Sequence, residues 1–482
     1  MRREARPVRQ QDMRSQPMRR VRRLHFVGIG GSGMAGIAEV LANLGYAVSG
    51  SDVRASAATE RLESMGVTVR IGHDAAQVQD ADAVVVSTAI DPGNPEVAEA
   101  RRTRKPIVRR AEMLAELMRF RYGIAIAGTH GKTTTTSLVA ALLAEGGCDP
   151  TFVVGGKVKS AGANARLGEG PYLVAEADES DASFLHLNPL IAALTNIDAD
   201  HLEAYGGDFA RLRATYVEFL QRLPFYGLAV VCADDAYNRE LIPQIGRPVT
   251  TYAVHREADF RASDLMPGQG GTRFKVSAPD GEHEDLFLAL PGEHNVANAL
   301  AAIAIAREVG VEWAAIGRAL AGFEGIGRRL EPCGDLQTGQ ARLALVDDYG
   351  HHPRELEATF QAVRAAWPGR RLLVVFQPHR YSRTRDCFDD LCAVLSTADA
   401  LVLCEVYPAG EQPIRGATSA ALAEALRTRG KIVPVVVHGP DEVVPLLPDI
   451  AADGDVVLTL GAGDIGGLPA KLRAAYAPAG RS

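Results

Sequence analysis

The chain has 482 residues, of which 47% are hydrophobic and 23% are charged, and its formal net charge is −7. This composition excludes a disordered chain, a coiled coil and a collagen-like fibre, and the length predicts roughly three domains at about 150 residues each. No run approaches about 18 consecutive apolar residues and the six cysteines form no C-x-x-C pair, so we expect a cytoplasmic protein without a membrane span.

Residues 1–23 form a basic segment ahead of the first predicted strand. They hold nine arginines against Glu4 and Asp12, and they lack the apolar stretch that a secretory signal needs. We therefore predict a disordered basic tail. Because the rest of the chain is acidic and offers no basic face to extend a nucleic-acid site, we expect no stable nucleic-acid partner.

Short β-branched runs recur along the rest of the chain, each followed by a polar or glycine-rich segment and then by a helical pattern. This order is typical of an α/β fold with parallel sheets, in which ligands bind beyond the carboxyl ends of the strands. We predict a Rossmann-like N-terminal domain over 24–119, a central P-loop ATPase-type domain with a parallel sheet over 120–327, and a C-terminal Rossmann-like domain over 328–482.

The predicted elements follow in chain order. The first domain has strands at 24–27 and 83–86, and its first helix carries Met34, Ile37 and Leu41 on one face and ends near Gly45. The central domain has strands at 124–127, 173–175, 191–194 and 229–231, a small antiparallel excursion over 249–291, and an apolar helix over 295–309. The third domain has strands at 343–346, 372–376, 400–403, 433–437 and 456–460.

A glycine loop at residues 28–33 lies between the first predicted strand and the first helix. It reads Gly28-Ile29-Gly30-Gly31-Ser32-Gly33, which fits G-x-G-x-x-G, and Asp52 lies nineteen residues after Gly33. The glycines let a pyrophosphate approach the helix N-terminus, and the carboxylate can accept a hydrogen bond from a ribose hydroxyl. The loop predicts a diphosphate ligand, either a dinucleotide or a nucleotide sugar.

A phosphate loop at residues 128–134 follows the first strand of the central domain. It reads Gly128-Thr129-His130-Gly131-Lys132-Thr133-Thr134, and Ile126 stands where the full pattern has its first glycine. Backbone N–H groups can wrap phosphate oxygens, Lys132 can neutralise the terminal phosphates, and the Thr133 hydroxyl can bind magnesium. We predict a nucleoside triphosphate site, and the missing glycine argues against the switch GTPases.

An acidic segment over 167–210 holds nine carboxylates and neither lysine nor arginine. Like charges crowded beside a triphosphate repel one another unless a cation lies among them. Because Mg²⁺ takes few protein ligands together with phosphate oxygens, we assign Thr133 and Glu176 to one ion. His201, which follows the next strand, can serve a second ion or a proton transfer.

Two motifs of the third domain also follow predicted strands. In Asp347-Asp348-Tyr349-Gly350-His351-His352-Pro353, adjacent histidines on extended backbone point to opposite sides, so we expect one to contact a substrate and the other to pack. The second motif is His379-Arg380-Tyr381-Ser382-Arg383-Thr384-Arg385. Because cations at a helix N-terminus oppose the macrodipole, Arg380 and Arg383 predict an anionic partner, a carboxylate or a phosphate.

These motifs, in this order, resemble those of the Mur ligases from about Leu24 to the C-terminus. They are HFVGIGGSGMAGIA, AGTHGKTTTT, AEADESDASF, TNIDADH, GEHNVANALAA, GIGRRLE, VDDYGHHP and FQPHRYSRTRD. The resemblance implies ligation of L-alanine to the lactyl carboxylate of UDP-N-acetylmuramate through an acyl phosphate, with ATP and Mg²⁺ as cofactors and ADP and phosphate as products. Such a ligase serves peptidoglycan precursor synthesis.

The resemblance also implies a role for each candidate site residue. Lys132, Glu176 and His201 would be catalytic, and Thr133, Glu176 and His201 would hold the metal. ATP would contact Gly128, Thr129, His130, Gly131, Lys132, Thr133, Thr134, His294, Asn295, Arg329 and Asp348. The substrates would contact Gly28, Gly30, Gly31, Ser32, Gly33, Asp52 and His73 on the nucleotide-sugar side, and Tyr349, His351, His379, Arg380 and Arg383 on the alanine side.

Three other functions remain open at this point. A related ligase reattaches a recovered tripeptide to the same nucleotide sugar. An NAD-dependent oxidoreductase would use the glycine loop but would leave the phosphate loop and the acidic segment unexplained. A regulatory nucleotide-binding protein would use its basic tail on nucleic acid. We expect a monomer or a weak homodimer.

Overall fold

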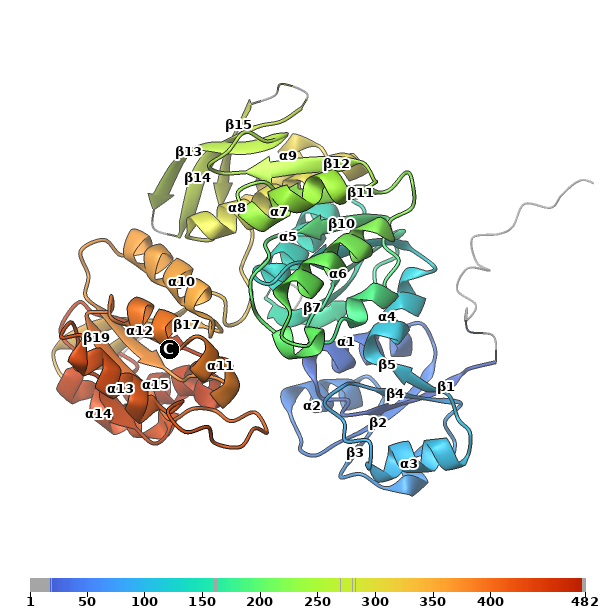
Figure 1. The fold of residues 1–482 in the computed structure, drawn as a ribbon, viewed down its shortest axis with the longest axis horizontal. Coiled ribbons are helices and arrows are strands. Elements are labelled where there is room, and N and C mark those ends of the chain that lie inside the picture. The colour runs from blue at the N-terminus through green and yellow to red at the C-terminus, as the bar shows by residue number, and fades with distance from the viewer. Residues whose placement is uncertain are drawn as a thin grey trace, which may run out of the picture. The chain divides into compact units, whose positions relative to one another are not determined.

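The computed structural model describes residues 18, 20–159, 163–268, 270–279, 281 and 283–478 (Figure 1). Most of the predicted basic tail, residues 1–17 and 19, lies outside the described residues. The chain divides into two compact units. The first unit runs to Arg261 and includes 277–282 and 298–319, and the second consists of 262–276, 283–297 and the chain from Leu320 onward.

The first sheet is fully parallel, with strand order β3-β2-β1-β4-β5. Its strands are β1 (Arg23–Val27), β2 (Ala47–Asp52), β3 (Thr68–Ile71), β4 (Ala83–Val86) and β5 (Ile107–Arg109). Its helices are α1 (Ser32–Asn43), α2 (Ala57–Ser64), α3 (Pro95–Arg102) and α4 (Arg110–Met118). The predicted inner face of α1 is confirmed, because Met34, Ile37 and Leu41 are all buried.

The second sheet has ten strands in the order β15-β14-β13-β12-β11-β10-β6-β9-β7-β8. They are β6 (Tyr122–Ala127), β7 (Thr151–Val158), β8 (Ala163–Arg166), β9 (Tyr172–Glu176), β10 (Ile191–Leu194), β11 (Leu228–Cys232), β12 (Val249–Ala253), β13 (Phe260–Gly268), β14 (Gly271–Ser277) and β15 (His283–Leu288). The associated helices are α5 (Lys132–Glu145), α6 (Phe209–Gln221), α7 (Ala236–Leu241), α8 (Glu293–Val309) and α9 (Trp313–Ala321). β9 and β10 lie parallel on either side of β6.

One prediction for this region is wrong. The antiparallel excursion was expected to include residues 249–253, but β12 runs parallel to β11. The reason is the helix α7 between them, which makes a strand–helix–strand crossover and so brings the chain back in the same direction. The apolar helix predicted over 295–309 is confirmed as α8, which begins two residues earlier, at Glu293.

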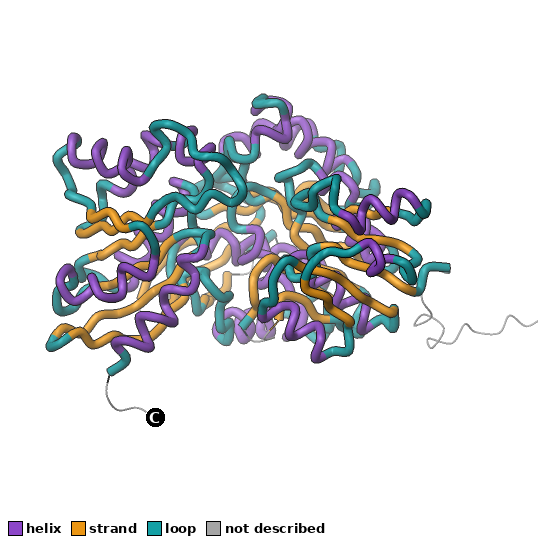
Figure 2. Tube along the Cα trace, turned by 90° about the horizontal axis from the view of Figure 1, so that it is seen from below, coloured by secondary structure: helices purple, strands orange, loops and turns teal. Residues whose placement is uncertain are grey.

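The third sheet has the order β16-β17-β21-β18-β19-β20, and all of its neighbouring strands are parallel except β16 and β17. The strands are β16 (Glu331–Thr338), β17 (Ala341–Asp348), β18 (Leu372–Phe376), β19 (Ala400–Cys404), β20 (Val435–Val437) and β21 (Val456–Leu460). The helices are α10 (Pro353–Ala366), α11 (Tyr381–Asp386), α12 (Phe388–Leu395), α13 (Ser419–Thr428), α14 (Val443–Ile450) and α15 (Leu468–Tyr476). The three predicted sheets are thus present, with helices packed along them (Figure 2).

A continuous hydrophobic core joins the first sheet to the central part of the second. It includes Leu41 of α1, Met113 of α4, Ala165 of β8 and Phe184, all of them buried. A Cβ added at Gly36 of α1 would lie 3.2 Å from both Val153 and Ala165, so α1 packs closely on β7 and β8. Among the described residues, no helix is both long and apolar enough to cross a membrane.

Candidate active site

The glycine loop leaves the carboxyl end of β1 and is held by the end of β2. The backbone N–H groups of Gly28 and Ile29 donate to the Ser51 carbonyl at 2.8 and 2.9 Å, and that of Gly30 donates to Asp52 Oδ2 at 2.8 Å. Gly31, the N-cap of α1, has no side chain with which to cap the helix. The first N–H groups of α1 are therefore suited to an anion, and Asp52 supports the loop itself.

His73 lies near this loop, beyond the end of β3. The Gly72 N–H donates to the Asp52 carbonyl at 2.8 Å, which ties the β3 end to the β2 end. His73 Nδ1 lies 3.0 Å from Ser51 Oγ and 3.2 Å from Glu96 Oε2. The structure therefore brings the predicted residues Asp52 and His73 to the same edge of the first sheet, and it adds Glu96, which the sequence analysis missed.

Two glycines allow the phosphate loop to pass close to neighbouring segments. Gly128 has φ +122°, and a Cβ there would lie 2.1 Å from Thr195 Oγ1. Gly131 has φ +83°, and a Cβ there would lie 2.5 Å from Asn298 Oδ1. Only glycine fits such close approaches combined with positive φ. Ile126, at the position of the missing first glycine, is fully buried in β6.

The segment after β10 holds the phosphate loop from one side. Asn196 Oδ1 accepts from the His130 N–H at 2.9 Å, and the Asp198 N–H donates to Thr129 Oγ1, also at 2.9 Å. His130 Nε2 lies 3.2 Å from Asp198 Oδ2. Asn196 and Asp198 therefore fix the loop conformation, a role that the sequence analysis did not assign to them.

Lys132, at the start of α5, forms a buried ion pair with Glu179. Lys132 Nζ lies 2.9 and 2.8 Å from the two Glu179 carboxylate oxygens and also donates to the Gly128 carbonyl at 2.6 Å. Burial acts to lower the pKa of Lys132, but the charges of Glu179 and Asp178 outweigh it and the pKa is raised. Burial raises the pKa of Glu179 to about 7, against the opposing effect of Lys132.

Asp178 receives a counter-charge from Arg110, at the start of α4. Arg110 Nη2 lies 2.8 Å from Asp178 Oδ2. Although burial acts to raise the pKa of Asp178, Arg110 and Lys132 hold it well below its usual range. The prediction that this acidic segment has no nearby cations is therefore wrong, because Arg110 and Lys132 approach it from other parts of the chain. Magnesium is not needed to neutralise Asp178 or Glu179.

The three residues assigned to metal binding lie at the end of a strand, in the first turn of a helix and in the segment that follows β10. Glu176 ends β9, opposite Ile126 of β6, and its Oε1 accepts from the Gly155 N–H at 2.7 Å. Thr133 is buried in the first turn of α5. His201 has φ +56° after β10, and its Nε2 lies 3.6 Å from Asp200 Oδ2. Because β10 and β9 flank β6, these segments leave the sheet at one edge.

In the second unit, the charge of Arg329 shifts the pKa values of two other residues predicted to contact the nucleotide, Asp348 and His294. Burial raises the pKa of Asp348 to about 6 while Arg329 opposes this, and the Asp348 carboxylate accepts the N–H groups of Leu330 and Gly350, both at 2.7 Å. Burial and Arg329 lower the pKa of His294 to about 4. Asn295 Nδ2 donates to the Pro291 carbonyl at 2.8 Å, at the start of α8.

The predicted alanine contacts gather in an aromatic row at the carboxyl ends of β17 and β18. Ring centroids of Tyr349 and His351 lie 5.6 Å apart, as do those of His351 and His379. His379 stacks on Tyr407 with 5.5 Å between centroids and 9° between planes. Burial, with His351 and the nearby arginines, lowers the pKa of His379 to about 3. Tyr407 was not singled out from the sequence, because no motif surrounds it.

The two arginines of this region adopt different roles. Arg383 is buried, with Nη1 3.4 Å from His379 Nδ1. Arg380 has φ +70°, an unfavourable conformation for a residue with a side chain, and its N–H donates to the Tyr407 carbonyl at 2.8 Å. The two adjacent histidines lie in different surroundings: His352 is the buried N-cap of α10, whereas His351 joins the aromatic row, and its contact with a substrate stays a prediction.

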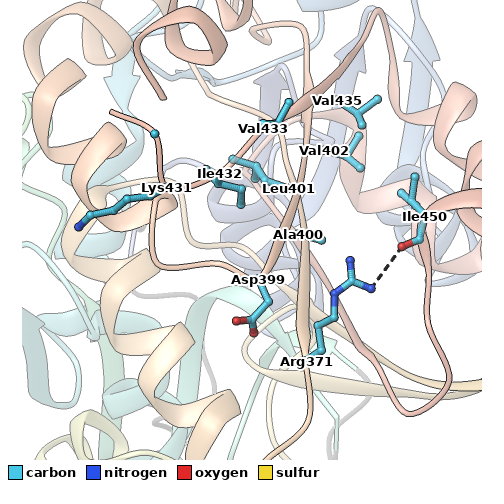
Figure 3. A pocket seen from close by; sticks show the side chains of 11 residues that line it. Arg371, Asp399, Ala400, Leu401, Val402, Lys431, Ile432, Val433, Val435 and Ile450 are labelled. Carbon is cyan, nitrogen blue, oxygen red and sulfur yellow. Dashed lines mark hydrogen bonds between the residues drawn. The ribbon is translucent and has the colours of Figure 1, made fainter. Parts of the chain in front are cut away.

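A cavity of about 460 Å³ lies at the opposite edge of the third sheet, near the amino ends of β19 and β20 (Figure 3). Arg371, Asp399 and Lys431 supply its charged groups, and Figure 3 shows Arg371 bonded to the Ile450 carbonyl. Its lining includes none of the predicted site residues. We therefore assign this cavity no part in substrate binding or catalysis.

Comparisons with known proteins agree across nearly the whole chain. Three family models match: "Mur ligase family, catalytic domain" over residues 23–122, "Mur ligase middle domain" over 126–306, and "Mur ligase, glutamate ligase domain" over 328–463. A UDP-N-acetylmuramate–L-alanine ligase of Halorhodospira halophila is 64% identical over 453 residues, which cover 94% of this chain and 93% of that protein. A ligase of the same name from Burkholderia pseudomallei is 61% identical, with 94% and 97% covered.

Solved structures of ligases also match this chain over most of its length. A UDP-N-acetylmuramate–alanine ligase from Thermotoga maritima matches with TM-score 0.79 and 30% identity, covering 93% of this chain and 98% of that one. A murein peptide ligase from Psychrobacter arcticus matches with TM-score 0.69 and 26% identity, covering 94% and 98%. A ligase named for alanine and a ligase named for a murein peptide therefore share this architecture.

Proposed function

The chain belongs to the Mur ligase family, and we propose that it joins L-alanine to UDP-N-acetylmuramate in an ATP-dependent step of peptidoglycan synthesis. The observation that carries this proposal is the 64% identity, over 94% of the chain, to a ligase of that name. The products are UDP-N-acetylmuramoyl-L-alanine, ADP and phosphate. We further propose that the enzyme is cytoplasmic and is a monomer or a weak homodimer.

The chemistry requires an activated carboxyl group, because a carboxylate is a poor electrophile. We propose that the lactyl carboxylate takes the γ-phosphoryl group of ATP to form an acyl phosphate. The amine of L-alanine then attacks the carbonyl carbon, and phosphate leaves with one oxygen of the original carboxylate. In this sequence Lys132 and the N-terminal N–H groups of α5 stabilise phosphoryl charge, and His201 is the candidate acceptor for the ammonium proton.

The residues proposed for magnesium fit that ion in part. Thr133 and Glu176 offer the hydroxyl and carboxylate oxygens that a hard cation prefers; Thr133 belongs to the phosphate loop, and Glu176 ends the strand beside β6, which leads into that loop. His201 offers a nitrogen, which suits Mg²⁺ less well, so proton transfer is the better role for it. When bound, the ion would neutralise charge on the phosphates of ATP.

The phosphate loop, rather than the glycine loop, favours an activation site in the first unit over an oxidoreductase. The glycine loop would bind the diphosphate of the nucleotide sugar, as it would a dinucleotide. The phosphate loop, with its buried Lys132–Glu179 pair, has no part in hydride transfer. The remaining alternative is a ligase that uses a tripeptide as acceptor. The relatives at 64% and 61% identity are named for L-alanine, and they favour L-alanine as the acceptor.

Product analysis tests the choice of acceptor. The purified full-length protein is incubated with UDP-N-acetylmuramate, ATP and Mg²⁺, together with L-alanine, the tripeptide or neither, and the products are identified by mass spectrometry. We expect the L-alanine adduct, with ADP formed in equal amount. Formation of the tripeptide adduct in preference to it would reject the proposal.

A further inference from the structure

Glu96 is a fully buried carboxylate that lies between two imidazoles in the first sheet region. It belongs to α3, and its Oε2 accepts from Ser51 Oγ at 2.6 Å and faces His73 Nδ1 at 3.2 Å. Its Oε1 lies 3.6 Å from Nε2 of His25, which is itself buried. His25 Nδ1 lies 3.0 Å from Ser49 Oγ, so the arrangement extends along β2.

A carboxylate is costly at such a place unless it is paired. Burial acts to raise the pKa of Glu96, but His25 and the Ser51 hydroxyl outweigh it and the pKa is lowered, so the group is held ionised. Stability alone gives no reason for this, because apolar side chains fill buried positions at least as well as ion pairs do. The buried Glu96 carboxylate is therefore better explained by the side chains that it orients, Ser51 and His73.

Ser51 and His73 connect Glu96 to the predicted diphosphate site. The Ser51 carbonyl accepts the N–H groups of Gly28 and Ile29, while the Ser51 hydroxyl donates to Glu96. His73 is the most exposed member of the group, with 17% of its side chain exposed, against 1% for His25. With Nδ1 turned toward Glu96, His73 presents Nε2 away from the buried carboxylate.

We propose that Glu96 is a positioning residue for nucleotide-sugar binding, which fixes the His73 ring with Nδ1–H toward Glu96 and Nε2 presented to the UDP portion of the substrate. This inference rests on the proposed function. The carboxylate does not touch the substrate, and it acts by selecting one ring orientation and one tautomer of His73.

Steady-state kinetics with Glu96→Gln test the proposal. The amide keeps the shape of the side chain, but it can turn a donor toward His73. At saturating ATP and L-alanine, we expect the KM for UDP-N-acetylmuramate to rise roughly 10-fold, with kcat within about 2-fold and the KM for ATP unchanged. The matched control is Glu39→Gln, which removes another buried carboxylate of this domain, the partner of Arg61 at 2.7 Å, and should leave all three values unchanged.

A double variant separates positioning from a general structural role. If Glu96 acts through His73, then Glu96→Gln added to His73→Ala raises the KM no further than His73→Ala alone. Additive effects, or equal effects of Glu96→Gln and Glu39→Gln, would overturn the inference. Loss of alanine-dependent ADP formation by the parent protein would instead contradict the proposed function.

The parent protein offers a readout that does not depend on the Glu96 variants. In ¹⁵N-labelled protein, the imidazole shifts of His73, identified by their loss in His73→Gln, should show a protonated Nδ1. A His73 ring protonated at Nε2 alone would overturn the inference, whatever the kinetics of the variants.

Discussion

Lys132 is the residue on which the proposed chemistry depends most, and in this structure it is also half of a buried ion pair with Glu179. We expect Lys132→Ala to lower kcat by about 100-fold or more. We also expect it to cost about 3–5 kcal/mol of stability, because Glu179 is left buried without a counter-charge. ADP formation and thermal melting measure the two effects.

The double variant Lys132→Ala with Glu179→Gln separates these effects. Removing both charges should restore most of the melting temperature, since no unpaired charge remains. Activity should stay low, because phosphate stabilisation needs the lysine itself. Recovery of activity together with stability would mean that Lys132 serves only to neutralise Glu179.

Asp348 predicts a defined pH dependence. Its pKa is raised to about 6 by burial, from an ordinary value of 3.8, so the folded state holds a proton that the unfolded state releases in this interval. Its contribution to stability is therefore full below pH 3.8 and is lost as the pH rises through about 6. Asp348→Asn removes this loss, so the melting temperature of the variant minus that of the parent should increase from pH 4 to pH 6.

The exposed Asp335, on β16 of the same unit, supplies the control for that experiment. Its side chain is 57% exposed beside Arg342, so Asp335→Asn should give a difference that stays flat over the same pH range. A flat difference for Asp348→Asn as well would show that burial does not raise this pKa.

Single residues could be predicted where their motif is local, and were missed where their partner is distant. Lys132 and Glu176 could be singled out because a loop and a strand end surround them in sequence, and their roles stay predictions. Arg110 lies 68 positions from Asp178, and Asn196 lies 66 positions from His130, so only the folded chain shows these contacts. The prediction that the acidic segment over 167–210 lacks counter-charges was wrong for that reason, because it considered only the charges within that segment.

At the scale of elements, the phosphate loop with α5 is the unit that a single methyl group can disrupt. Gly128→Ala places a Cβ 2.1 Å from Thr195 Oγ1 at φ +122°, so we expect at least a ~10-fold loss of ATP-dependent activity and a lower melting temperature. The matched control is Gly147→Ala, beyond the other end of α5. Its φ is +77° and no atom lies within 4 Å of the added Cβ.

Gly147→Ala should cost only about 1–2 kcal/mol, for the backbone conformation, and leave kcat within about 2-fold. The comparison therefore isolates the close approach from the effect of positive φ. Equal loss of activity in both variants would show that positive φ alone, rather than the close approach to Thr195, accounts for the loss at Gly128.

Strands made of buried, β-branched residues were predictable, whereas β7 and β16, which contain glycine or proline, were missed. β7 contains Gly155 and Gly156, and β16 contains Pro332 and Gly334 at a break in its pairing with β17. Glycine and proline argue against a strand in sequence, yet they are tolerated near sheet edges and at bulges. Pro434 likewise explains why β20 begins at Val435 rather than at residue 433.

At the scale of the whole molecule, the three predicted sheets are present, but the chain groups them into two compact units. The first sheet joins the central part of the second because α1 packs against β7 and β8. Neither β7 nor β8 was predicted, so this contact could not be foreseen. The domain boundaries at 119/120 and 327/328 remain predictions.

Removal of divalent cations tests the proposed magnesium requirement on the intact enzyme. Chelation should abolish alanine-dependent ADP formation, and added Mg²⁺ should restore it, because the oxygens proposed to hold the ion, those of Thr133 and Glu176, would lose it. Thr133→Val and Glu176→Gln should each raise the Mg²⁺ concentration needed for half-maximal rate. Full activity after chelation would contradict this assignment.

Oxygen transfer from substrate to phosphate tests the central claim most directly. UDP-N-acetylmuramate carrying ¹⁸O in its lactyl carboxylate is turned over with ATP and L-alanine, and the released phosphate is analysed by mass spectrometry. Activation through an acyl phosphate predicts one ¹⁸O atom in each phosphate formed. Phosphate without ¹⁸O, released together with the alanine adduct, would contradict the account.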